Sequence, residues 1–253
     1  TVCEEAMCPN IGECWSHHTA TFMIMGENCT RRCQFCSVKD GTAGNLEDLD
    51  PYEPFRTAMA VKKLGLKHVV ITSVDRDDIE DYGAGHFAQT VRQLHQHVPE
   101  CKIELLIPDL QGSRSDLATI MREGVTVLNH NLETVPRLYK KVRPGSGYIR
   151  SLSILRWAKE LDPSSLTKSG IMVGLGETAE EVEGVMDDLR DANVDIMTIG
   201  QYLRPTEKQM PVKEYVTPEQ FAAYKDIGTK KGFRHIESAP FVRSSYHAWK
   251  HVE

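Results

Sequence analysis

Three cysteines, Cys29, Cys33 and Cys36, lie in one short stretch, with three and then two residues between them. Thiolates at this spacing can bind three irons of one iron-sulfur cube and leave the fourth without a protein ligand. Metal sites that do chemistry keep such a position open for a small molecule. Zinc sites usually contain paired Cys-x-x-Cys units or cysteine with histidine, and the chain has no second Cys-x-x-Cys pair. The spacing favours a cluster over a zinc knuckle or a chance group of buried thiols.

The same stretch, with Phe35 directly before the third cysteine, resembles the signature of the radical S-adenosylmethionine (SAM) superfamily. The resemblance implies that Cys29, Cys33 and Cys36 hold a [4Fe-4S] cluster. It also implies that the fourth iron binds the amino and carboxylate groups of SAM.

Another set of cysteines, Cys3, Cys8 and Cys14, is the first along the chain and has four and then five residues between its members, so Cys29, Cys33 and Cys36 form the second set. Turn formers such as Pro9 and Gly12 lie between them and would let the thiolates converge on one cluster. A purely structural cluster or a zinc ion is the alternative. Six of the seven cysteines fall in the first 36 residues. Because disulfide frameworks of that density belong to much shorter chains, we expect bound metal in a reducing compartment.

The run from Cys3 to Trp15, followed by the second cysteine motif, resembles the lipoyl synthase family. Near the C-terminus, Arg-Ser-Ser-Tyr at 243–246 also matches a motif of that family. The resemblance implies an auxiliary [4Fe-4S] cluster held by Cys3, Cys8, Cys14 and a serine, for which we choose Ser244 and hold Ser245 in reserve. An alkoxide is a poorer, more exchangeable iron ligand than a thiolate, which suits a cluster that is consumed.

The resemblance implies a sulfurtransferase. It implies that SAM at the reduced Cys29/Cys33/Cys36 cluster is split into methionine and a 5′-deoxyadenosyl radical, which removes hydrogen from an octanoyl group on a lysine of a lipoyl carrier protein. Sulfur from the auxiliary cluster is then placed at C6 and C8 in two rounds. The implied partners are the octanoylated carrier (a lipoyl domain or glycine-cleavage H protein), a reducing electron donor such as ferredoxin or flavodoxin, and an iron-sulfur cluster carrier.

Two other functions are compatible with bound clusters. One is a different radical SAM enzyme, such as a methylthiotransferase or a biotin-synthase-like sulfur inserter. It would not be expected to combine the first cysteine set with Arg-Ser-Ser-Tyr. The other is a non-catalytic iron-sulfur scaffold or electron carrier. Production of 5′-deoxyadenosine from SAM separates an enzyme from a scaffold.

Length and composition limit the class of protein that this chain can be. The 253 residues suit one barrel-like domain, and 40% apolar with 26% charged residues is ordinary for a soluble protein. A net charge of -6 argues against a nucleic-acid partner. We find no run of about 18 apolar residues and expect no membrane partner. We expect a bacterial cytoplasm in preference to an organelle matrix. The chain begins at Thr1 without an initiator methionine, so we expect a preceding segment that would hide any targeting signal.

Apolar runs and helical periodicity alternate along the chain and predict six strand-plus-helix units. The predicted strands are 21–25, 68–73, 103–107, 125–128, 168–173 and 195–202. The predicted helices are 53–64, 85–97, 113–122, 148–161, 179–192 and 217–230. Six units instead of eight predict an α/β fold, a partial (β/α)6 TIM-like barrel open on one side. We expect an N-terminal extension at 1–20, the barrel at 21–232 and a C-terminal segment at 233–253.

Polar side chains follow two of these strands, and the carboxyl ends of barrel strands converge on one mouth. The resemblance implies that Ser73 and Asp75 lie at the methionine end of SAM and that Asn131 and Glu133 bind its ribose. Arg143 would meet the SAM carboxylate or the substrate backbone. The alternatives are helix capping for the aspartate and an ordinary surface position for the arginine.

Other residues of the same regions have a lower expected role. We rank Asp77 and Asp78 behind Asp75, and His130 behind Asn131. Arg31 and Arg32 would steady the cluster or remain solvated. The loop at 174–178 resembles the superfamily backbone that supports adenine. Cys101 is expected to be a passive thiol.

Overall fold

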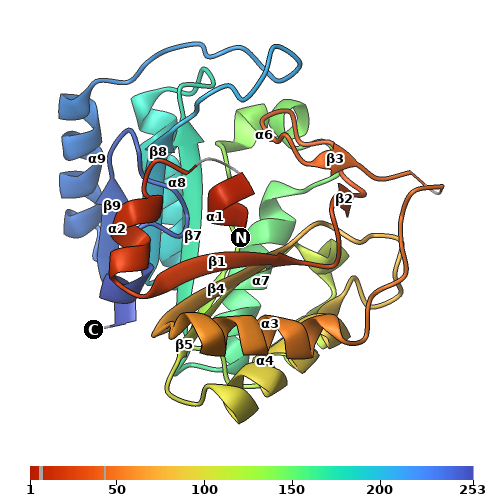
Figure 1. The fold of residues 1–253 in the computed structure, drawn as a ribbon. Helices are drawn as coiled ribbons and strands as arrows, with labels where there is room; N and C mark the ends of the chain where they lie inside the picture. The colour runs from red at the N-terminus through yellow and green to blue at the C-terminus, as the bar shows by residue number, and fades with distance from the viewer. Residues whose placement is uncertain (6–7, 43, 253) are drawn as a thin grey trace.

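The computed structural model describes residues 1–5, 8–42 and 44–252, so Ala6 and Met7 of the first cysteine motif lie outside the described residues. In that part, seven parallel strands form one sheet in the order β1-β4-β5-β6-β7-β8-β9 (Figure 1). The strands are β1 (Thr19–Ile24), β4 (His68–Ser73), β5 (Lys102–Leu106), β6 (Val127–Asn129), β7 (Leu166–Val173), β8 (Ile196–Gln201) and β9 (His235–Ser238). The predicted partial TIM-like barrel is confirmed, but six strands were one too few.

Helices connect consecutive strands and cover the outside of the sheet (Figure 1). They are α3 (Glu53–Leu64), α4 (Ala84–His97), α5 (Arg114–Met121), α6 (Pro136–Val142), α7 (Tyr148–Leu161), α8 (Ala179–Asp191) and α9 (Pro218–Lys230). Short elements complete the described chain: α1 (Val2–Glu5), α2 (Ile11–Ser16), η1 (Leu110–Gly112), η2 (Ala248–Val252) and a small sheet of β2 (Asn28–Cys29) with β3 (Lys39–Asp40). Parallel pairing requires such crossovers, because the chain must return to the same end of the sheet.

Local signals fix several helix ends. The hydroxyl of Thr178 accepts from the backbone N–H of Glu181, whose carboxylate accepts from the backbone N–H of Thr178. This capping box starts α8. Thr217 caps α9 in front of Pro218, and Gly65 ends α3 at φ 61°. Each of these ends was readable from residue type.

The strand that sequence analysis missed is β9. It reads His-Ile-Glu-Ser, and only Ile236 is buried, so no apolar run marks it. It pairs with β8 from Ile196 opposite His235 to Ile199 opposite Ser238. The predicted division at 20/21 and 232/233 stays a prediction.

A charged pair lies in the barrel interior. Glu104 of β5 and Lys168 of β7 are fully buried, with Lys168 Nζ 2.9 Å from Glu104 Oε1. Asn129 donates to the same oxygen at 3.0 Å. Burial opposes the charged form of Glu104, but Lys168, His68 and His251 together outweigh it and lower the pKa of Glu104 to about 2. The Glu104 carboxylate therefore stays ionised at neutral pH.

We expect Lys168→Met to lower the free energy of unfolding by about 3–5 kcal/mol, since it leaves the Glu104 carboxylate buried without its cation. Urea unfolding at pH 7 measures this. The matched control, Lys225→Met, breaks a half-exposed pair with Glu237 at 3.7 Å and should change the free energy of unfolding by no more than about 1 kcal/mol.

The same pair makes stability depend on pH. The folded pKa of Glu104 lies below its unfolded value, so the stabilisation is present above the unfolded pKa and is lost as pH falls through the folded pKa. A Lys168→Met protein as stable as the parent would contradict this reading.

The barrel is open between its two edge strands, β1 and β9, among the described residues. The chain after β9 lies across this opening. The hydroxyl of Thr21 in β1 donates to the hydroxyl of Ser245 at 3.0 Å, and η2 contacts β4. His251 of η2 is fully buried near Glu104 and Lys168. The C-terminal segment thus brings Arg-Ser-Ser-Tyr next to β1.

No helix in the described part of the chain is long and apolar enough to span a membrane.

Candidate functional site

The second cysteine set lines a cavity of about 280 Å³ at the carboxyl ends of the strands, which we call the Cys29 cavity. Its walls include residues predicted to bind the cluster or SAM, namely Cys29, Cys33, Cys36, Ser73, Asp75, Asn131, Glu133 and Arg143. The backbone N–H of Asp75 donates to Cys29 Sγ at 3.3 Å, and the backbone oxygen of Asp75 accepts from Thr30. The cysteine loop is thereby tied to the exit of β4.

Burial dominates the chemistry of these thiols. It raises the pKa of Cys29 to about 12, with the Asp75 carboxylate adding to the shift, and raises the pKa of Cys33 to about 11 against the opposing charge of Arg143. Burial raises the pKa of Cys36 as well. Iron binding must therefore displace protons from all three thiols.

Polar atoms beside the Cys29 cavity fit a ligand with amino-acid and ribose groups. Ser73 Oγ, Asn131 Oδ1 and Arg143 Nε are buried and have no hydrogen-bond partner among the described residues. The other end of the Arg143 guanidinium is fixed, because Nη1 donates to the Asn131 backbone oxygen and the Tyr139 hydroxyl, both at 2.7 Å. Buried polar groups are costly unless they are paired, so these atoms favour a polar ligand.

Glu133 has a positive backbone φ angle. It has φ 68°, a left-handed conformation that is uncommon for a glutamate. Two hydrogen bonds to β7 hold it there: its N–H donates to the Gly170 oxygen and its oxygen accepts from Met172, both at 2.9 Å. Burial raises the pKa of Glu133, although Arg143 and Asn131 favour its charged form. Strain of this kind persists mostly at functional sites.

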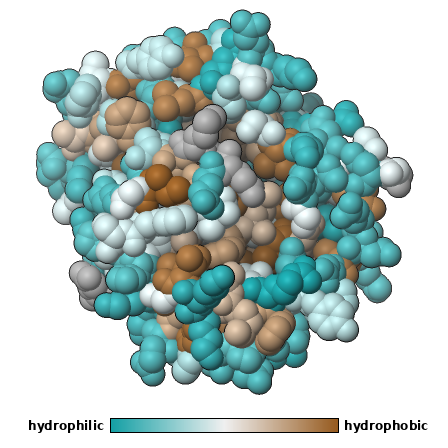
Figure 2. All heavy atoms as spheres, in the orientation of Figure 1, coloured by the Kyte–Doolittle hydropathy of each residue, from teal (hydrophilic) through white to brown (hydrophobic). Residues whose placement is uncertain are grey.

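The first cysteine set lines a larger cavity of about 480 Å³, the Cys14 cavity. Cys3, Cys8 and Cys14 face it together with Ser244 and Ser245 from the other end of the chain. Figure 2 shows apolar surface gathered over α1, α2 and β1 on this side, within a hydrophilic rim. Burial, then Cys8 and Cys3, raise the pKa of Cys14 to about 11. In the described residues, no group of three or more His, Cys, Asp and Glu side chains could hold a single metal ion.

The two serines of the motif differ. The Ser245 hydroxyl accepts from Thr21, whereas Ser244 makes no side-chain hydrogen bond to any described residue. Ser244 also lines a third cavity, of about 260 Å³, and Ser245 does not. This geometry favours Ser244 as the group that is free to bind.

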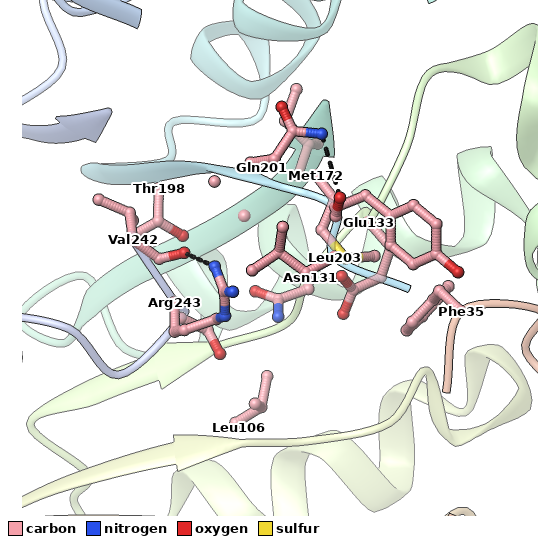
Figure 3. Close-up of a pocket in the computed structure, with 15 residues that line it drawn as sticks. Phe35, Leu106, Asn131, Glu133, Met172, Thr198, Gln201, Leu203, Val242 and Arg243 are labelled. Atoms are coloured by element: carbon pink, nitrogen blue, oxygen red, sulfur yellow. Dashed lines mark hydrogen bonds between the residues drawn. The ribbon is translucent and has the colours of Figure 1, made fainter. Parts of the chain in front are cut away.

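The third cavity joins the other two, and we call it the bridging cavity (Figure 3). Asn131 and Glu133 belong to it and to the Cys29 cavity, while Ser244 and Arg243 belong to it and to the Cys14 cavity. Figure 3 shows the side chains of Asn131 and Glu133 between Arg243 and Phe35. The two cysteine sets therefore line neighbouring cavities that share walls with the bridging cavity.

Gly200 of β8 lets the C-terminal segment approach the sheet. A Cβ atom there would lie 2.2 Å from the Val242 backbone oxygen. We expect Gly200→Ala to lower the free energy of unfolding by about 1–3 kcal/mol, since the added methyl group displaces backbone. Gly184→Ala on α8, with nothing within 4 Å of the new Cβ, should raise it by about 0.5–1 kcal/mol. Urea unfolding of both variants measures the difference, and equal effects would contradict the close approach.

Comparison with known proteins decides the family. Residues 23–189 match the Radical SAM superfamily. The lipoyl synthase of Rubrobacter xylanophilus is 57% identical over 253 residues, which is 100% of this chain and 78% of that protein. The lipoyl synthase of Caldanaerobacter subterraneus subsp. tengcongensis is 58% identical over 98% of this chain and 86% of its own length. The chain belongs to the lipoyl synthase family.

Solved structures of lower identity share the fold. Streptococcus suis SuiB bound to S-adenosylmethionine has a TM-score of 0.68 at 12% identity, over 94% of this chain and 56% of that one. Methylornithine synthase (PylB) has a TM-score of 0.64 at 17% identity, over 87% of this chain and 71% of that one. Membership of the lipoyl synthase family confirms the predicted enzyme class, a radical SAM sulfurtransferase, and the predicted cofactors, SAM and [4Fe-4S] clusters. The roles of single residues stay predictions.

Residues ranked lower by sequence have structural partners. Arg31 is buried and pairs with Asp77 at 2.8 Å and Asp109 at 2.6 Å, while exposed Arg32 lies 3.6 Å from Asp40. Asp78 pairs with Arg76. His130 lines the Cys29 cavity, but both of its ring nitrogens already have partners. Nδ1 lies 2.8 Å from the Ile107 backbone oxygen, and Nε2 lies 2.8 Å from the Ser151 hydroxyl. Burial lowers the pKa of His130 to about 4, which keeps it neutral. Cys101 is buried, apart from both cysteine sets.

The loop at 174–178, which resembles the backbone that supports adenine, lines none of the three cavities in the described chain, and its role stays a prediction. Gly170, inside β7, lines the bridging cavity. A Cβ atom at Gly170 would lie 2.4 Å from Thr198 Oγ1 and 3.1 Å from Asn131 Oδ1. A glycine inside a strand is a signal of such close approach, so this position was readable.

Proposed function

We propose that the chain inserts sulfur at C6 and C8 of an octanoyl group carried on a lysine of a lipoyl carrier protein. The observation that carries the proposal is the connection between the two cysteine-lined cavities through the bridging cavity. A radical formed at one cavity has to meet a carbon that can also reach the sulfur source at the other. Walls shared by both sites allow this without release of the substrate.

The Cys29 cavity is the proposed SAM site. Cys29, Cys33 and Cys36 would hold the cluster that supplies the electron for splitting SAM into methionine and a 5′-deoxyadenosyl radical. Arg143 is placed to bind the SAM carboxylate through Nε, because its Nη1 is already used. Asp75 would accept from the SAM ammonium group. Burial raises the pKa of Asp75, and a bound cation would favour its charged form.

The ribose would lie against Asn131 and Glu133. Ser73 adds a hydroxyl on the methionine side. These side chains exclude water and fix the direction in which the radical carbon points, which is the protein's share of a cofactor reaction. The held backbone of Glu133 keeps its carboxylate in place.

The Cys14 cavity is the proposed sulfur source. Cys3, Cys8, Cys14 and Ser244 would form the donor set, three thiols and one hydroxyl that makes no side-chain hydrogen bond to a described residue. A hydroxyl ligand exchanges more easily than a thiolate, so Ser244 can leave as the cluster is consumed. The finer partners, a lipoyl domain or H protein as carrier, ferredoxin or flavodoxin as donor and a cluster carrier for resupply, belong to this proposal.

Single-turnover analysis tests the proposal. The reconstituted chain is incubated anaerobically with SAM, a strong reductant and an octanoylated lipoyl-domain peptide, and 5′-deoxyadenosine and thiolated peptide are quantified together. The proposal predicts two equivalents of 5′-deoxyadenosine for each fully thiolated peptide. Production of 5′-deoxyadenosine without thiolation would move the assignment to another radical SAM substrate.

A further inference from the structure

Helix α2 carries Cys14 and also Glu13, whose carboxylate binds two side chains from the end of the chain. The Tyr246 hydroxyl donates to Glu13 Oε2 at 3.0 Å, and His247 Nε2 lies 2.9 Å from Glu13 Oε1. The Tyr246 and His247 rings are stacked at 3.7 Å. One carboxylate next to a thiol of the Cys14 cavity thus holds the two residues that follow the serine pair.

Contacts on both sides of Ser244 extend this arrangement. Asn10, in the loop before α2, donates to the Phe241 backbone oxygen at 2.8 Å. Thr21 of β1 donates to Ser245 at 3.0 Å. The polypeptide on either side of Ser244 is therefore fixed to the N-terminal region, although more than 220 residues separate each pair.

His247 also lies beside a thiol of the Cys14 cavity. Its backbone N–H is close enough to Cys14 to oppose the rise that burial causes in the pKa of that thiol. On its far side the His247 ring lies 3.4 Å from Glu237 of β9, and its neighbour Trp249 stacks on His17 at 4.3 Å. His247 is thus placed by the Glu13 carboxylate on one side and by β9 on the other.

We propose that Glu13, with Asn10 and Thr21, forms a latch that positions Ser244 toward the three thiols of the Cys14 cavity and His247 N–H toward Cys14. Glu13, Tyr246 and His247 are positioning residues, because they act through Ser244 and Cys14. The latch rests on the proposed function only for the role of the positioned Ser244, which is to bind the auxiliary cluster. It has a chemical reason: a hydroxyl binds iron weakly, so the protein must hold it near the site instead of relying on its affinity.

Hydrogen exchange of the full-length, cluster-loaded chain tests the latch. We expect Glu13→Ala to speed amide exchange at 244–250 by about tenfold or more, because two hydrogen bonds to a carboxylate are lost. Glu13→Gln keeps an acceptor oxygen and should restore most of the protection. The matched control is Glu4→Ala, which removes another exposed carboxylate of the N-terminal region, one paired with the Thr1 amine. Exchange at 244–250 that is the same in Glu13→Ala and the parent would overturn the latch.

A spectroscopic measurement separates positioning from mere stability. In a chain with Cys29, Cys33 and Cys36 replaced by alanine, only the Cys14 cavity retains a complete cysteine set. There, Glu13→Ala should give the same change in the electron paramagnetic resonance of that cluster as Ser244→Ala. A spectrum that only Ser244→Ala alters would overturn the latch. Failure of the parent chain to insert sulfur would instead reject the proposed function, and the exchange comparison would still decide the latch.

Discussion

Replacing Cys33 by alanine is expected to lower 5′-deoxyadenosine production from SAM below the detection limit. Cys33 faces the Cys29 cavity near Arg143 and Glu133. Its thiolate would therefore hold the cluster beside the residues proposed to contact SAM. With two thiolates left, the cluster loses the ligand set that holds three irons. Liquid chromatography of the reaction after reduction measures the product, and iron analysis should show that the first cysteine set still binds iron.

The matched control is Cys101→Ala. Cys101 is also a buried thiol whose pKa burial raises to about 11, but it lies apart from both cavities. It should retain parental SAM cleavage and iron content. Retained 5′-deoxyadenosine in Cys33→Ala would remove the basis for assigning the Cys29 cavity to SAM.

Cys8→Ala should have the second large effect, and a different one. It removes a thiol from the Cys14 cavity and leaves every wall residue of the Cys29 cavity in place. SAM cleavage should therefore continue while sulfur insertion falls below detection. Incubating the variant with octanoylated peptide, and measuring 5′-deoxyadenosine and thiolated peptide in the same sample, separates the two activities.

Ser244→Ala and Ser245→Ala refine the same experiment. The Ser245 hydroxyl is engaged by Thr21, so Ser244→Ala should impair sulfur insertion more strongly than Ser245→Ala. A Cys8→Ala protein that still thiolates would show that the Cys14 cavity is not the sulfur source.

The sequence predicted most of the barrel because its strands are apolar and its helices are capped. The bounds of β4, α3 and α7 were predicted to the residue, since each combines clear periodicity with a turn or cap at its ends. The strand β9 was not predicted because only one of its four residues is buried. Helix α6 was not predicted because its seven residues are too few for helical periodicity to mark it.

Site residues were predicted from type and from position at the strand ends. The cysteines were predicted as ligands from their spacing. Asp75, Asn131 and Glu133 were predicted from the resemblance and from their place after strands whose ends converge. The structure brings these residues around one cavity, and their roles stay predictions. What the sequence did not reveal depends on segments far apart in the chain: the contact of Gly200 with Val242, the bridging cavity, and the pairing of Glu13 with Tyr246.

The decisive measurement is the mass of an octanoylated lipoyl-domain protein after anaerobic incubation with the reconstituted chain, SAM and a strong reductant. The mass should increase by two sulfur atoms, because two C–H bonds become two C–SH groups at C6 and C8. An unchanged mass, with 5′-deoxyadenosine still produced, would contradict the proposed function.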